Sequence, residues 1–156
     1  EGRFAISHFR VFGGTHTEKV EIFRDIASLE KRSLHPVAVA LMDAAQAEGA
    51  RPRRDEKVDD FRVIPGQGVG AFIQGRGEIL VGNTKMASNV FQGGFVSLSR
   101  SYPEAVHCVK LWENEGCTCG WVFKDKTPLA IFAANDDPRP YSRAAIQDLE
   151  RLGVET

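Results

Sequence analysis

Two helical runs meet at a corner that contains a proline, and this junction constrains the fold more than any other feature. The runs "TEKVEIFRDIASLEKR" and "VAVALMDAAQAEG" both repeat apolar residues with helical spacing. Thr15 and Glu18 have the spacing of a capping box, which predicts where the first helix begins. Pro36 suits the first turn of the second helix, where its missing N–H costs no hydrogen bond, and Gly49 suits its left-handed end. The segment "SLHP" is therefore predicted to be a fixed corner between two helices.

Strand patterns surround this helical pair. "RFAISHFRVF" precedes it, and "FRVIP", "VGAFIQG" and "EILVGN" follow as short runs broken by Gly and Pro, which predicts an antiparallel meander. Ser101 and Glu104 predict a second capping box for a later helix, and "CTCGWVFKD" and "PLAIFAAN" predict two more strands. This order predicts an α+β fold with a mainly antiparallel sheet of about six strands, flanked by helices.

The end of the chain changes pattern. "PLAIFAANDDPRPYSRAAIQDLERLGVET" combines an apolar strand, a polar loop and an amphipathic helix, which is typical of the beginning of a parallel α/β unit. We therefore expect a main domain over residues 1–127 and an incomplete second unit over 128–156.

Length and charge narrow the function classes. The 156 residues suit one main core, and 20 Lys and Arg against 21 Asp and Glu leave a net charge of -1, so no field favours nucleic acid or an anionic membrane. No apolar run approaches the roughly 20 residues that cross a bilayer. Cys108, Cys117 and Cys119 lack metal-finger spacing, and "CTC" fits half-buried strand residues better than a soft-metal site. We expect a soluble chain from a reducing compartment, with no metal site of its own.

The stretch "PGQGVGAFIQGRG" leaves two interpretations open. Gly66, Gly68 and Ala71 satisfy the dinucleotide fingerprint G-x-G-x-x-A, which would make the chain an oxidoreductase-like domain. That fingerprint requires a strand before it and a helix after it, whereas Pro65 precedes it and strand-like residues follow. Alternatively, glycines at every second position leave one face of a strand without side chains, so that a flat ligand or another backbone could lie against it.

Taken in order, the motifs resemble the nucleotide-binding domain of the heavy-metal-transporting P-type ATPases. "ASLEKRSLHPVAVAL" is similar to that family's E-x-x-S-E-H-P-L-A-x-A-I, and "GQGV", "VGN" and "DDPRPYSRAAIQDLERLGV" follow as in the family, the last matching D-x-x-R-P and its helix. The resemblance covers nearly the whole chain, which would be the segment between the phosphorylation motif and the TGD motif. Leu34 departs from the pattern, because the family usually has glutamate there.

The resemblance implies an ATP site at the corner. Adenine needs a smooth wall, a group that packs on its plane and one or two directional partners. The expected wall is Gly66, Gly68 and Val69. His35 would pack against or hydrogen-bond the base, and Glu30 would accept a hydrogen bond from its exocyclic amine.

Four further residues are implied at the other end of the nucleotide. Gly82 and Asn83 would approach the ribose and phosphates. Asp136 and Arg139 match the D-x-x-R of the hinge with the phosphorylation domain, where they would orient the nucleotide or lock the hinge. The unit over 128–156 would belong to that domain.

The resemblance also implies ligands, partners and location. ATP or ADP would bind with a magnesium ion held together with the phosphorylation domain, and the phosphorylation and actuator domains of the same pump would be partners. The segment would be a cytoplasmic domain of an integral membrane protein, with no nucleic-acid partner and no direct membrane contact. Because the sequence lacks the phosphorylated aspartate, we expect it not to turn over ATP alone. A ligand-free interaction domain stays open as a further alternative.

Overall fold

A computed structural model describes residues 3–31 and 33–137 of the chain. Its elements in chain order are β1 (Arg3–Val11), α1 (His16–Glu30), α2 (Pro36–Ala47), β2 (Val58–Ile64), β3 (Gly68–Ile73), β4 (Gly77–Gly82), α3 (Thr84–Val90), α4 (Gly94–Ser101), α5 (Pro103–Asn114), β5 (Thr118–Lys124) and β6 (Thr127–Asp137).

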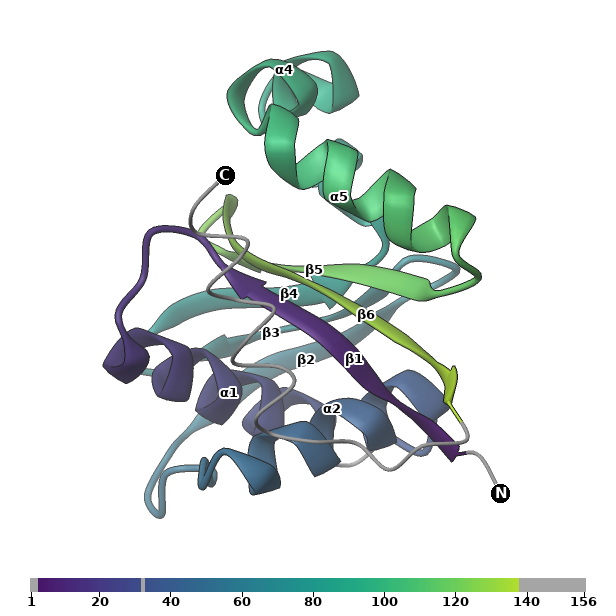
Figure 1. The fold of residues 1–156 in the computed structure, drawn as a ribbon. Coiled ribbons are helices and arrows are strands. Elements are labelled where there is room, and N and C mark those ends of the chain that lie inside the picture. Colours follow the sequence, from purple (N-terminus) through teal and green to yellow (C-terminus); the bar gives the residue numbers. More distant parts are fainter. Residues whose placement is uncertain (1–2, 32, 138–156) are drawn as a thin grey trace.

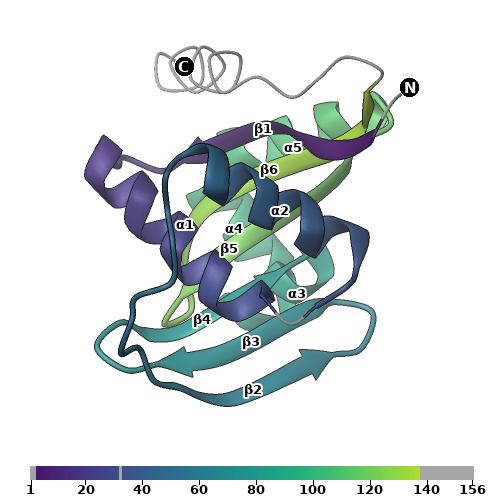
Figure 2. The ribbon, with the colours of Figure 1, turned by 90° about the horizontal axis from the view of Figure 1, so that it is seen from below.

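The strands form one six-stranded sheet in the order β1-β6-β5-β4-β3-β2. Every neighbouring pair is antiparallel, which confirms the predicted α+β architecture and the meander of β2, β3 and β4. Helices α1 and α2 cover one face of the sheet, and α4 and α5 lie over the other (Figure 1). The view from below shows α1 and α2 side by side across the sheet (Figure 2).

Each face of the sheet carries its own hydrophobic core. Side chains of a strand alternate between faces, so Ile79 and Val81 of β4 pack toward α1 and α2, whereas Leu80 packs with Trp121 on the opposite face. Under α1, the ring of Phe9 stacks on that of Phe23 with centroids 4.3 Å apart. The centre of the sheet is therefore buried on both faces.

The predicted helix boundaries are largely confirmed. Thr15 and Glu18 form the capping box of α1, Pro36 opens α2, and Gly49 has a φ of 78°. The second predicted capping box is wrong. Ser101 ends α4, which sequence reasoning missed, and α5 begins at Pro103 with no side-chain cap.

Strand β6 is an interior strand of the six-stranded sheet. It pairs with β1 on one side and β5 on the other, and both pairings are antiparallel, not parallel as the end of the sequence indicates. The boundary expected after residue 127 therefore falls at the first residue of a strand of this sheet. The helix expected within 138–156 lies outside the described residues.

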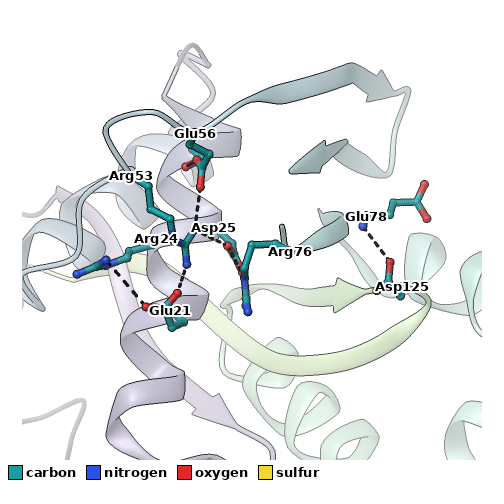
Figure 3. A network of polar contacts seen from close by, with 9 residues as sticks. Glu21, Arg24, Asp25, Arg53, Glu56, Arg76, Glu78 and Asp125 are labelled. Carbon is teal, nitrogen blue, oxygen red and sulfur yellow. Dashed lines mark hydrogen bonds and ion pairs between the residues drawn. The ribbon is translucent and has the colours of Figure 1, made fainter. Parts of the chain in front are cut away.

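A buried carboxylate joins three segments below the sheet. Asp25 of α1 is fully buried, and Arg76 of the β3–β4 turn donates to it from Nε at 3.1 Å and from Nη2 at 2.7 Å (Figure 3). Arg53, from the loop before β2, contacts Asp25 at 3.3 Å and Glu56 at 2.7 Å. Burial raises the pKa of Asp25, and the hydrogen bonds from Arg76 oppose that rise. The network fastens the β2–β3–β4 meander to α1.

Candidate functional site

A cleft of about 470 Å³ lies between the α1–α2 corner and the face of the sheet, a volume within the usual range for small-ligand sites. Its lining brings together most of the residues singled out from the sequence: Glu30, His35, Gly66, Gly68, Val69, Gly82 and Asn83. The remaining lining residues are Ser33, Val37, Ala38, Val63, Ile64, Gln67, Val81, Thr118, Cys119, Gly120 and Phe132.

The cleft exists because β4 leaves the sheet earlier than its neighbour. The last β4–β5 pair joins Gly82 to Trp121, after which the chain turns into α3. Strand β5 extends back to Thr118, so its first residues have no β4 neighbour. The start of α2 stands over this gap, and the space between them is the cleft.

Local hydrogen bonds fix the corner that carries the two polar groups. The backbone N–H of Ser33 donates to the carbonyl of Glu30 at 2.9 Å, and the Ser33 hydroxyl accepts from the N–H of His35 at 3.2 Å. His35 is the N-cap of α2, with its Nδ1 accepting from the N–H of Val37 at 3.2 Å. These bonds define the backbone of the corner, and Glu30 and His35 both line the cleft.

The Nε2 atom and the ring face of His35 are available to a ligand. Because Nδ1 accepts a hydrogen bond, the proton of the neutral ring lies on Nε2. The side chain is exposed and lines the cleft, so Nε2–H can donate to an acceptor on a ligand while the ring packs against a flat group.

Glu30 is an unusual residue for the lining of a cleft. It is only 5% exposed, and burial raises its pKa from 4.5 to about 7. Within residues 3–31 and 33–137, no side chain donates a hydrogen bond to its carboxyl group. A buried carboxylate gains from a donor, so this group is suited to accept a hydrogen bond from a ligand amine.

Glu30→Gln should therefore remove a pH dependence of stability. The folded-state pKa lies above the unfolded value, so the native state binds more protons and the free energy of unfolding falls as pH rises from about 4.5 to about 7. We expect a decrease of about 1 to 3 kcal/mol across this window in the parent and a flatter profile in Glu30→Gln. Urea denaturation between pH 4.5 and 8 measures it, and identical profiles would contradict this assignment.

The glycines of the wall allow two strands to approach closely. A Cβ at Gly68 would lie closer than 3.0 Å to the Val81 carbonyl and to the backbone of Gly82. A Cβ at Gly82 would meet the Gln67 carbonyl in the same way. The sequence left two roles for the strand face without side chains, which were to contact a flat ligand or to contact another backbone. At Gly68 the structure shows another backbone against this face. Gly66 has a φ of 70°, which favours glycine in this turn.

Asn83 holds the glycine turn in place. Its Oδ1 accepts from the N–H of Met86 at 3.0 Å as the N-cap of α3, and its Nδ2 donates to the carbonyl of Gly66 at 2.9 Å. Its backbone N–H donates to the carbonyl of Gln67 at 2.8 Å. Both the oxygen and the nitrogen of the Asn83 side-chain amide thus make hydrogen bonds that hold the glycine turn beside α3.

Of the two residues expected at the hinge, the structure describes only Asp136. Asp136 is exposed in β6, opposite Phe4 of β1, and does not line the cleft; Arg139 lies outside the described residues. Sequence reasoning also missed Gly120 and Phe132, which do line it. A glycine inside the strand "CTCGWVF" was the available signal for Gly120.

The alternative chemistries find no support. The residues after Gly66 and Gly68 form β3 and not a helix, so the dinucleotide interpretation is wrong.

Within residues 3–31 and 33–137, no group of three or more His, Cys, Asp or Glu side chains could hold a metal ion. A search of the same residues finds no helix long and apolar enough to cross a membrane.

Comparison with known proteins finds relatives among metal-transporting ATPases. No family model matches the chain. It is 32% identical over 155 residues to the cadmium/zinc-transporting ATPase HMA3 of Oryza sativa subsp. japonica, with 99% of this chain and 14% of the relative covered. It is 32% identical over 154 residues to the copper-exporting P-type ATPase B of Archaeoglobus fulgidus, with 99% and 20% covered. The chain thus spans a fifth or less of the length of these relatives.

A solved structure shares the fold. The N-domain of HMA8, a copper-transporting P-type ATPase, superposes with a TM-score of 0.58 at 22% identity, over 83% of this chain and 97% of that structure. At this identity the similarity concerns the fold alone.

Proposed function

This chain is homologous over almost its whole length to one segment of the heavy-metal-transporting P-type ATPases and has the fold of their N-domain, and on this premise we propose that it binds ATP in the cleft. In the whole pump it would position the nucleotide so that the γ-phosphate reaches the aspartate of the phosphorylation domain. The phosphorylation and actuator domains would then be its partners, and it would be a cytoplasmic domain of an integral membrane protein.

One observation carries the proposal: Glu30 and His35 converge on a cleft whose opposite wall is backbone and valine. Adenine has flat apolar faces, an exocyclic amine that donates and ring nitrogens that accept. Val69 and the glycine strands offer the flat wall, Glu30 the acceptor, and the Nε2–H and ring of His35 a donor and a packing surface. Each feature of the base has a counterpart here.

The lining suits a base better than a triphosphate. It includes no Lys or Arg side chain among the described residues, and its single carboxylate is Glu30. The described residues do not fit a magnesium site, because no group of three metal-ligating side chains is present among them. We therefore assign the phosphates and their magnesium ion to the neighbouring phosphorylation domain.

Calorimetric titration of the purified chain with ATP, ADP, GTP and NAD tests the proposal. ATP and ADP should bind to one site with similar affinities, GTP more weakly, and salt between low and moderate concentration should change the affinity little. Preference for NAD would favour a dinucleotide ligand, and no binding of any nucleotide would favour an interaction domain. Either of these results would overturn the proposed ATP site.

A further inference from the structure

A buried aromatic ring borders the cleft where the sheet is open. Phe132 of β6 is 1% exposed and stacks on Phe9 with ring centroids 6.4 Å apart, and it also lines the cleft. Its partner directly across the β5–β6 ladder is Gly120, which lines the cleft too. The ring thus separates the core under α1 from the space proposed for the ligand.

Gly120 leaves the room that this ring occupies. A Cβ added at Gly120 would lie closer than 3.0 Å to Cζ, Cε1 and Cε2 of Phe132, so the tip of the ring lies over the glycine. Phe9 and the close-packed core stand behind the ring. We therefore expect a ring displaced by a side chain at position 120 to move toward the cleft, which it lines.

We propose that Phe132, seated over Gly120, forms the floor of the cleft and sets its depth for the purine base. The inference rests on the proposed ATP site and adds a specificity-determining pair that the family motifs in the sequence do not contain. The base would lie between the backbone wall and the ring of His35, and Phe132 would limit how deep it enters the cleft.

A double-mutant cycle tests this floor. Gly120→Ala should push the ring into the cleft and raise the Kd for ATP at least about tenfold. In a Phe132→Leu background, which lacks the ring atoms that meet the new Cβ, the same substitution should change Kd less than about twofold. Additive effects in the two backgrounds would overturn the inference.

Two matched controls separate the floor from general destabilisation. Gly70→Ala also adds a Cβ that meets a side chain, that of Leu80, but Gly70 does not line the cleft, so ATP affinity should stay that of the parent. If Gly120→Ala does not fold, Phe132→Leu alone should raise Kd about three- to tenfold. Phe123→Leu, in the core on the other face, should leave Kd unchanged.

The outcomes for the floor and for the site are distinguishable. Failure of the parent to bind ATP would overturn the proposed function and this inference with it. Binding by the parent together with a parent-like Kd for Gly120→Ala, or for Phe132→Leu where Gly120→Ala does not fold, would overturn the floor alone.

Discussion

Gly68→Ala is expected to lower the free energy of unfolding by about 3 kcal/mol or more and to weaken ATP binding at least about tenfold. The added Cβ would meet the Val81 carbonyl and the Gly82 backbone, neither of which can rotate away as a side chain can. Strands β3 and β4 would have to separate at the pair that forms the wall of the cleft. Urea denaturation and titration of the folded protein measure both effects.

The control for this substitution is Gly70→Ala in the same strand. Its Cβ would meet the methyl end of the Leu80 side chain, which can adjust, so a smaller loss of stability and an unchanged Kd are expected. If Gly68→Ala kept the parent's unfolding midpoint and affinity, the close approach of the two strands would have no part in the site.

Asp25→Ala should destabilise the chain by about 2 to 4 kcal/mol without changing the Kd of the folded protein for ATP. Arg76 and Arg53 would lose the buried carboxylate that they share, and the meander would lose its link to α1. None of these three residues lines the cleft, so stability and affinity should separate.

An exposed ion pair, Arg10–Glu104, provides the control for Asp25→Ala. Glu104 lies 3.4 Å from Arg10 and its side chain is 57% exposed, so Glu104→Ala should cost less than about 1 kcal/mol. Equal losses for the two variants, measured by urea denaturation, would contradict the role given to the buried network.

Features that depend on neighbours in sequence could be predicted. The capping box of α1 and the place of Pro36 follow from residues within a few positions of one another, and both are present. Helix α4 could not be predicted in the same way. Its N-cap Gly93 and its first residue Gly94 both have positive φ, so its sequence lacks an ordinary start signal.

Pairing between neighbouring strands, as in the β2–β3–β4 meander, could be predicted, but pairing between distant strands could not. The place of β1 beside β6 comes from contacts more than a hundred residues apart, such as that of Phe9 with Phe132. The floor at Gly120 and the reason for Gly68 depend on which backbone lies opposite each glycine. The burial of Glu30 likewise follows from how α1 and α2 sit on the sheet. Local motifs therefore indicated most of the residues singled out for the candidate site, seven of which line one cleft, and packing explains the shape of that cleft.

The Kd of His35→Asn for ATP is the most direct test that this corner binds the base. Asparagine keeps the N-cap of α2, so the unfolding midpoint should stay near that of the parent while the ring is lost. We predict a Kd raised about tenfold to a hundredfold, because a packing surface and one hydrogen bond are removed. A folded His35→Asn variant with the parent's affinity would contradict the assignment of the adenine site to this cleft.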